Sequence, residues 1–214
     1  MASDPSPVTV AAGQWRTGPH NGGMDHPKTP HETRLLELLK ERSFRRGDFR
    51  LASGETSDYF IDGKMTAVHS EGAFLIGEVL YERLRDTAFD AIGGLQVGAV
   101  PLITAAVIAC HRHGRPVEGF WVRDEVKDHG TQKRIEGGLK EGSRVVIVDD
   151  VFTKGGSSMK AVEAARQAGC EVVLVIALVD RLQGARERFR QNGIEDCRAV
   201  FTIGDFGVSA DGPS

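Results

Sequence analysis

Two adjacent carboxylates, Asp149 and Asp150, stand directly after an apolar, β-branched run that extends from Val145 to Val148. Such a run is typical of a strand buried on both faces of a parallel sheet, and open α/β sheets bind ligands at the carboxyl ends of their strands. Residues 153–158, rich in glycine and hydroxyl side chains, then open into a helical pattern. Glycines before a helix N-terminus leave backbone N–H groups free to hold an anion. Acceptors for sugar hydroxyls beside donors for a phosphate predict a ribose 5-phosphate site.

Other nucleotide-binding fingerprints are absent from the sequence. It contains neither G-x-x-x-x-G-K-[ST] nor a G-x-G-x-x-G after a strand. A strand–turn–helix connection with Asp and Gly can also be purely structural. The combination of Asp-Asp, Thr, Gly-Gly and Ser within one short segment favours the binding interpretation. This combination resembles the motif with which type I phosphoribosyltransferases bind 5-phosphoribosyl 1-diphosphate (PRPP).

A second glycine-rich turn extends from Gly93 to Pro101. Gly93, Gly94 and Gly98 would let backbone amides approach a diphosphate closely. An equally good interpretation is a tight turn that feeds the next helix, because Pro101 suits the first helical turn in either case.

Residues 123–138 form a long polar stretch without consistent periodicity. Loops longer than about 12–15 residues inside a compact domain are usually lids or disordered linkers. Arg123, Lys127 and His129 are suited to a leaving diphosphate, which gains negative charge as its bond to the sugar breaks. Acidic residues of the same stretch balance its basic ones, so a solvated linker stays the alternative to a mobile catalytic loop.

Arg181 follows an apolar strand pattern at 171–179. A guanidinium at a strand end can make a bidentate contact with a planar carboxylate, such as that of an acidic base. An ion pair with Asp180 or with a neighbouring acid is the structural alternative. The run 110–113, Cys-His-Arg-His, does not predict a metal site, because neighbouring helical positions do not converge on one ion.

Strand and helix patterns alternate along most of the chain. Such alternation predicts an α/β fold with a mostly parallel sheet flanked by helices, and the early elements outside it predict a small N-terminal hood. We expect a disordered leader at 1–30 and one domain at 31–214, with its hood at about 31–65 and its mobile loop at 123–138. Helices are expected from about 31 and at 70–85, 99–113, 157–168 and 183–191, and strands at 49–51, 59–61, 91–93, 117–122, 145–148, 171–179 and 198–203.

Composition narrows the class of partner. The chain has 214 residues and a formal net charge of −3, which gives no reason to expect nucleic acid or an anionic membrane as a partner. Three cysteines without C-x-x-C spacing argue against a disulfide framework. The longest apolar run, 172–179, is far too short for a membrane span, and no secretory signal is evident. We expect a cytoplasmic protein.

Taken together, these segments resemble the orotate phosphoribosyltransferase family from about residue 31 to residue 206. The hood pattern Ser-Gly-x-x-Ser-x-Tyr-Phe and the Lys-x-His-Gly loop are similar to the orotate branch, whereas the acidic motif is general to phosphoribosyltransferases. The likeness is carried by Phe49–Lys64 (FRLASGETSDYFIDGK), Gly93–Pro101, Val122–Gly130 (VRDEVKDHG) and Val148–Ser157 (VDDVFTKGGS), followed by Asp180-Arg181.

The resemblance implies a role for each matching residue. Asp149 and Asp150 would hold the ribose hydroxyls and, with Lys127 and His129, form the catalytic set. Orotate would contact Thr153 and Arg181. PRPP would be bound by a larger set: Arg123, Lys127, His129, Asp149, Asp150, Val151, Phe152, Thr153, Lys154, Gly155, Gly156 and Ser157.

The resemblance also implies Mg²⁺ as a cofactor, held mainly by substrate oxygens rather than by a protein metal site. It implies PRPP and orotate as substrates, orotidine 5′-monophosphate and diphosphate as products, and a homodimer whose 123–138 loop acts across the interface. This reaction belongs to de novo pyrimidine (UMP) biosynthesis. Two alternatives remain: a phosphoribosyltransferase for another base, or a non-catalytic regulator that binds PRPP or nucleotide. Asp124 and Gly98, where many members have basic residues, motivate the second.

Overall fold

A six-stranded sheet forms the centre of the computed structural model, which describes residues 27–50, 56–124 and 134–208. Neighbouring strands are parallel except at one edge, where β4 (Glu118–Val122) and β5 (Ile135–Gly137) are antiparallel. The predicted α/β fold with a mostly parallel sheet is therefore confirmed. The order across the sheet is β5 (Ile135–Gly137), β4 (Glu118–Val122), β3 (Ala91–Leu95), β6 (Arg144–Phe152), β7 (Glu171–Asp180) and β8 (Cys197–Thr202).

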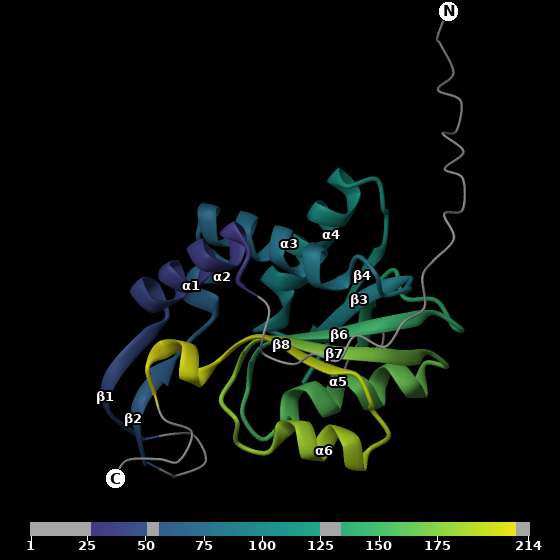
Figure 1. Ribbon diagram of the computed structural model, residues 1–214. Helices are drawn as coiled ribbons and strands as arrows, with labels where there is room; N and C mark the ends of the chain where they lie inside the picture. The colour runs from purple at the N-terminus through teal and green to yellow at the C-terminus, as the bar shows by residue number, and fades with distance from the viewer. Residues whose placement is uncertain (1–26, 51–55, 125–133, 209–214) are drawn as a thin grey trace, which may run out of the picture.

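Helices cover both faces of this sheet (Figure 1). One face carries α3 (Ser70–Leu84) and α4 (Ala99–Arg112), and the other carries α5 (Gly156–Gln167) and α6 (Ala185–Gln191). Alternate residues of β6 serve the two cores: Val146 and Val148 belong to the α3–α4 side, and Val145 and Ile147 to the α5 side. A strand with two buried faces has no polar alternation, which is why this run is continuously apolar.

The hood consists of the helices α1 (Pro30–Arg42) and α2 (Lys64–Ala67) and an antiparallel hairpin of β1 (Phe44–Arg50) and β2 (Thr56–Ile61). A capping box in which Thr29 and Glu32 bond each other's backbone N–H starts α1. Near the other end of the described chain, the 3₁₀ turn η1 (Ile203–Phe206) lies against the hairpin, with Phe44 and Phe206 ring centroids 5.3 Å apart. The hood is thus supported by a segment distant in sequence.

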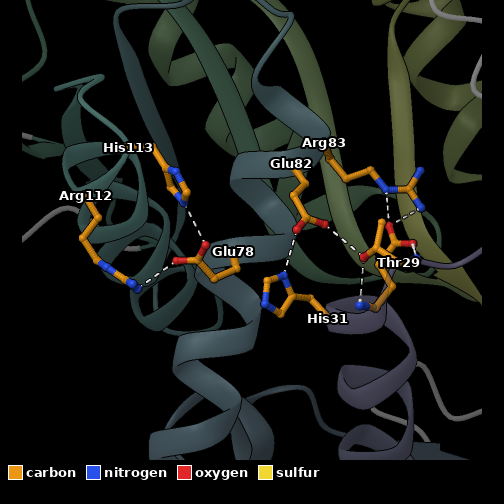
Figure 2. A network of polar contacts seen from close by, with 8 residues as sticks. Thr29, His31, Glu78, Glu82, Arg83, Arg112 and His113 are labelled. Atoms are coloured by element: carbon orange, nitrogen blue, oxygen red, sulfur yellow. Dashed lines mark hydrogen bonds and ion pairs between the residues drawn. The ribbon is translucent and has the colours of Figure 1, made fainter.

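Buried and half-buried charges join the helices on the hood side (Figure 2). Glu78 of α3 accepts hydrogen bonds at 2.9 Å from Arg112 and at 2.8 Å from His113, at the end of α4. At the end of α4, two residues of the 110–113 segment, Arg112 and His113, therefore bind the Glu78 carboxylate. Within the described ranges, no cluster of His, Cys, Asp or Glu is suited to hold a metal ion.

Several element boundaries differ from the sequence-based expectation. Part of the predicted 123–138 loop forms β5, a strand too short to show periodicity. The predicted strand 145–148 continues to Phe152, so the acidic pair lies within β6 rather than after it. The short elements α2 and η1 were not predicted. Thr29, inside the predicted leader, donates a hydrogen bond to Glu82 at 3.0 Å. In the described part of the chain, no helix has the length and apolar character needed to cross a bilayer.

Candidate functional site

The site lies where the order of the strands reverses along the chain. β3 is flanked by β4 on one side and β6 on the other, so the connections after β3 and β6 leave the sheet in opposite directions. Ligands of open α/β sheets bind in this crevice, at the carboxyl ends of the strands. An ideal Cβ on Gly98 would lie 3.0 Å from Asp150 Oδ1, which places the turn after β3 against the acidic pair. The two glycine-rich segments predicted from the sequence therefore meet.

Asp149 is a buried carboxylate that is already engaged by its own segment. Its oxygens accept hydrogen bonds from the Ser158 hydroxyl at 2.6 Å and from the Asp150 backbone N–H at 3.0 Å. Burial, and secondly the neighbouring Asp150 charge, raise the pKa of Asp149 well above the ordinary range. Asp149 thus fixes the start of α5 to the end of β6.

Asp150 is packed between two glycines of different segments. A Cβ on Gly63 would lie 2.8 Å from Asp150 Cβ, and the one on Gly98 would be almost as close. Burial raises the pKa of Asp150, and the Lys64 charge opposes that rise. Of the two acids, Asp150 is the one that borders both the hood and the turn after β3.

Lys64 borders the acidic pair, and sequence reasoning did not assign it to the site. Its Nζ lies 2.6 Å from Asp62 Oδ1 and 4.0 Å from Asp150 Oδ2. Burial lowers the pKa of Lys64, but the hydrogen bond to Asp62 and the nearby acids outweigh burial and leave the pKa raised. The available signal was its place two residues after Asp62, where the hairpin ends in the quoted hood motif.

The loop after β6 has the geometry of an anion site. Gly155 has φ +72°, and a Cβ there would lie 2.9 Å from the Phe189 ring. A residue with a side chain would be strained in this conformation and would clash with the ring. No side-chain hydrogen bond caps the N-terminus of α5, and the first backbone N–H groups of a helix can hold an anion. This arrangement fits the predicted phosphate cradle, Thr153 to Ser157.

Arg181 is held by the hood. Its Nε donates to the Tyr59 hydroxyl at 2.8 Å, its Nη2 donates to Ser57 Oγ at 3.2 Å, and its guanidinium lies 4.4 Å from the centre of the Tyr59 ring. Its backbone N–H donates to the Phe152 carbonyl at 2.9 Å, directly before Thr153. Asp180 instead binds Arg186 at 2.7 Å. The alternative of an Asp180–Arg181 ion pair is therefore wrong.

The basic residues expected around a diphosphate are only partly described. Arg123 Nη2 lies 2.7 Å from Glu136 Oε1 on β5, and the backbones of Arg123 and Arg134 join the two ends of the loop at 2.9 Å. Asp124 pairs with Lys160 of α5. Lys127 and His129 lie outside the described residues.

Two glycines of the predicted 93–101 turn, Gly93 and Gly94, lie within β3 and have a packing explanation. A Cβ on Gly93 would lie 2.4 Å from the Phe120 ring, and one on Gly94 would lie 2.3 Å from the Val148 carbonyl oxygen. The structural interpretation thus accounts for Gly93 and Gly94, whereas Gly98 faces the acidic pair.

Comparison with known proteins assigns the family. Residues 65–198 match the family described as the phosphoribosyl transferase domain. The orotate phosphoribosyltransferase of Bradyrhizobium sp. (strain ORS 278) is 45% identical over 183 residues, covering 84% of this chain and 98% of that protein. The chain belongs to the orotate phosphoribosyltransferase family. Another member, from Sorangium cellulosum, is 46% identical over 176 residues, covering 81% of this chain and 91% of its own length.

Solved structures of the family share the fold. The Mycobacterium tuberculosis H37Rv orotate phosphoribosyltransferase in complex with Fe(III) dicitrate has a TM-score of 0.74 and 37% identity, covering 84% of this chain and 100% of that chain. The same enzyme in complex with PRPP has a TM-score of 0.71 and 35% identity, with equal coverage. The predicted family and fold are confirmed, while the roles of individual residues stay predictions.

Proposed function

We propose that this protein transfers the 5-phosphoribosyl group from PRPP to orotate, giving orotidine 5′-monophosphate and diphosphate in de novo pyrimidine (UMP) biosynthesis. Family membership supports the reaction. The observation that carries the proposal is the placement of the acidic pair beside an uncapped helix N-terminus at the point where the strand order reverses. That placement offers acceptors for a pentose and donors for its phosphate in one crevice.

The ribose 5-phosphate would be bound by the segment from β6 to α5. Backbone N–H groups of 153–157 would surround the phosphate, and Asp149 and Asp150 would accept hydrogen bonds from the ribose hydroxyls, with Val151 and Phe152 contributing backbone. As the bond from C1′ to the diphosphate oxygen breaks, positive charge develops on the sugar. Nearby carboxylates would stabilise that charge. An orotate ring nitrogen would form the new bond to C1′ and give up its N–H proton to the departing diphosphate.

The orotate carboxylate would be recognised by Arg181. Tyr59 and Ser57 orient the guanidinium. The hydrogen bond from the Arg181 backbone N–H to the Phe152 carbonyl places the Arg181 backbone next to Thr153. A pre-oriented guanidinium suits a planar carboxylate, which uracil and purines lack. This arrangement supports the proposal that the acceptor is orotate rather than another base.

The diphosphate would require cations beyond those in the described crevice. Among the described residues, the Lys64 Nζ lies 2.6 Å from Asp62 Oδ1 and 4.0 Å from Asp150 Oδ2, so this cation is already engaged by carboxylates. We assign the leaving group to Arg123, Lys127 and His129 of the 123–138 loop. When bound, Mg²⁺ would neutralise charge on the diphosphate. The oxygen donors of the acidic pair suit such an ion, but the described residues hold no three-ligand cluster, so substrate oxygens would supply most of its ligands.

We further propose a homodimer in which the 123–138 loop reaches the partner's site, and a cytoplasmic location. Cys110, Cys170 and Cys197 are free thiols, which fits a reducing compartment.

The deciding experiment follows diphosphate release from PRPP and Mg²⁺ with orotate, uracil or hypoxanthine as the acceptor. Release should require orotate and should match the loss of orotate absorbance. Equal release with uracil would contradict the role of Arg181. Binding of PRPP and orotidine 5′-monophosphate without any release would favour the non-catalytic regulator.

Removing the Lys127 ammonium should separate chemistry from base binding. We expect Lys127→Ala to lower kcat by about 10²-fold or more, because the positive charge that would stabilise the leaving diphosphate is removed. The Kd of orotate should change little. Single-turnover kinetics and equilibrium binding measure the two quantities. Unchanged kcat under saturating substrates would remove Lys127 from the chemistry.

A further inference from the structure

The side chain of Lys64 connects the hood with the acidic pair. Its Nζ lies 2.6 Å from Asp62 Oδ1 and 4.0 Å from Asp150 Oδ2. The second distance is too long for a hydrogen bond, so of these two carboxylates only Asp62 accepts one from the ammonium. The side chain of Lys64 is 46% exposed. Lys64 thus brings a positive charge to the acidic pair without being locked to it.

The backbone that carries Lys64 is fixed. Lys64 is the first residue of α2, whose Thr66 and Ala67 are buried. The Thr66 hydroxyl lies 2.7 Å from the Ser43 hydroxyl, and Gly72 packs so closely on the Thr66 carbonyl that no side chain would fit there. A lysine ammonium, by contrast, sits on a flexible four-carbon stem. The ammonium can therefore change partners by rotation of its own side chain while α2 keeps its place.

Asp62 is a partner that can release the ammonium. Its Oδ1 also accepts a hydrogen bond from the Lys64 backbone N–H at 3.1 Å, and its side chain is 24% exposed. Ion pairs between partly exposed groups are weak, and a carboxylate that keeps its backbone donor and is reached by water loses little when the ammonium leaves. The Asp62–Lys64 contact is therefore a resting position of the ammonium rather than a rigid bridge.

The place of Lys64 matches the leaving group of the proposed substrate. In PRPP, the carbon that bears the diphosphate is bonded directly to a carbon that bears a hydroxyl. Because the proposed function has Asp150 accept the ribose hydroxyls, a cation 4.0 Å from Asp150 Oδ2 is within reach of the oxygens on C1′. The start of α2 therefore lies beside the expected diphosphate.

The turn after β3 makes a cation from the hood necessary on this side of the crevice. Gly98 of the turn and Gly63, directly before Lys64, both pack on Asp150. Residues 96–100 are Gln-Val-Gly-Ala-Val and bring no positive charge, so the turn can offer a diphosphate only backbone donors. Of the two segments that meet on Asp150, the one from the hood supplies the ammonium.

We propose that Lys64 binds the diphosphate of PRPP, turning from Asp62 to a diphosphate oxygen when the substrate enters. This inference rests on the proposed function and adds a hood residue to the cations assigned to the 123–138 loop. The ammonium keeps its proton and donates hydrogen bonds. It therefore stabilises the negative charge that gathers on the diphosphate as the bond to C1′ breaks.

Calorimetric titration of the full chain with two ligands tests the proposal. PRPP with Mg²⁺ and orotidine 5′-monophosphate share the ribose 5-phosphate, but only PRPP carries a diphosphate. Lys64→Gln should raise the Kd of PRPP about 10-fold, because a charge-assisted hydrogen bond is lost, and should leave the Kd of orotidine 5′-monophosphate unchanged. Lys64→Arg keeps the charge and should recover most of the PRPP affinity.

Two further variants exclude a merely structural role. Asp62→Asn breaks the same ion pair but keeps the ammonium and an oxygen for the Lys64 backbone N–H, so it should not weaken PRPP binding. Lys40→Gln removes the same charge from an exposed position of α1 and should change neither Kd. Circular dichroism checks that all variants are folded.

The outcomes separate this inference from the proposed function. An unchanged Kd of PRPP in Lys64→Gln, or equal weakening of PRPP and orotidine 5′-monophosphate, would overturn the role of Lys64. So would equal weakening of PRPP binding by Lys64→Gln and Asp62→Asn. Orotate-dependent diphosphate release by the wild type would then leave the function standing. A selective loss of PRPP affinity in Lys64→Gln, with a wild type that releases no diphosphate with orotate, would support the role of Lys64 and contradict the reaction.

Discussion

The phosphate half of the candidate site comes from one continuous segment, residues 149–158. The base half instead combines Arg181, which directly follows β7, with Ser57 and Tyr59 of the hood. In the phosphate half, the contacts of Asp149 with Ser158 and with the next backbone N–H are local. In the base half, residues more than 120 positions apart are bonded directly. A local motif keeps its geometry wherever the strand and helix form, while the base half depends on how the hood sits on the sheet.

The largest expected effect tests the phosphate half. Asp150→Asn should lower kcat/KM for PRPP by about 10²–10³-fold, since a carboxylate near the developing ribosyl cation is lost. The shape of the side chain is kept, so folding should be retained. Steady-state kinetics with varied PRPP measures the effect. A loss of less than about threefold would remove Asp150 from the site.

A smaller effect should be specific to the base half. Arg181→Lys should raise the KM of orotate about 10–100-fold with little change for PRPP, because the planar fork that Tyr59 and Ser57 orient is lost. Tyr59→Phe is the matched variant: it keeps the ring and removes only the acceptor of the Nε bond, so its effect should be several-fold weaker. Equal losses for orotate and PRPP would contradict the separation of the two halves.

A backbone substitution should reveal how rigid the phosphate half is. Gly155→Ala should lower the free energy of unfolding by about 2–3 kcal/mol, because it combines a positive φ with the Phe189 clash. Gly184 also has a positive φ, +93°, but nothing lies within 4 Å of its added Cβ. Gly184→Ala should therefore cost only about 1 kcal/mol. Urea unfolding compares the two; an equal cost would mean that the ring contact relaxes freely.

The smallest expected effect is on pH dependence. Burial raises the pKa of Asp149 in the folded state, so the folded protein binds more protons than the unfolded chain above the ordinary Asp value of 3.8. The free energy of unfolding then falls as pH rises from that value to the raised one. Asp149→Asn removes this pH-dependent loss. Between these two pH values, its free energy of unfolding should therefore rise by at least about 1 kcal/mol relative to that of the wild type. Urea unfolding at several pH values measures both proteins. If the free energies of unfolding of the wild type and Asp149→Asn changed in parallel with pH, the expected effect of Asp149 would be contradicted.

The distinction between local and long-range contacts also explains which features could be predicted from the sequence. The acidic pair and the start of α5 were predictable because they belong to one short segment, within which Asp149 contacts Ser158 and the next backbone N–H. Arg181 was recognised as a candidate, but its partners were not, since nothing in the sequence states how the hood meets β7. Lys64 was missed for the same reason: its relation to Asp150 exists only after two distant segments fold together. The short strand β5 carried too few residues to show a period.

The contact of η1 with the hood connects the last turn of the described chain with the proposed recognition of orotate by Arg181. Phe206 packs on Phe44, and the Gly207 carbonyl accepts a hydrogen bond from Arg46 at 2.6 Å, so both brace the hairpin that orients Arg181. Truncation after Gly204 would remove this brace without deleting any residue assigned to substrate. Such a shortened enzyme should discriminate less well between orotate and uracil, so η1 and Gly207 would contribute to substrate specificity without contacting the substrate.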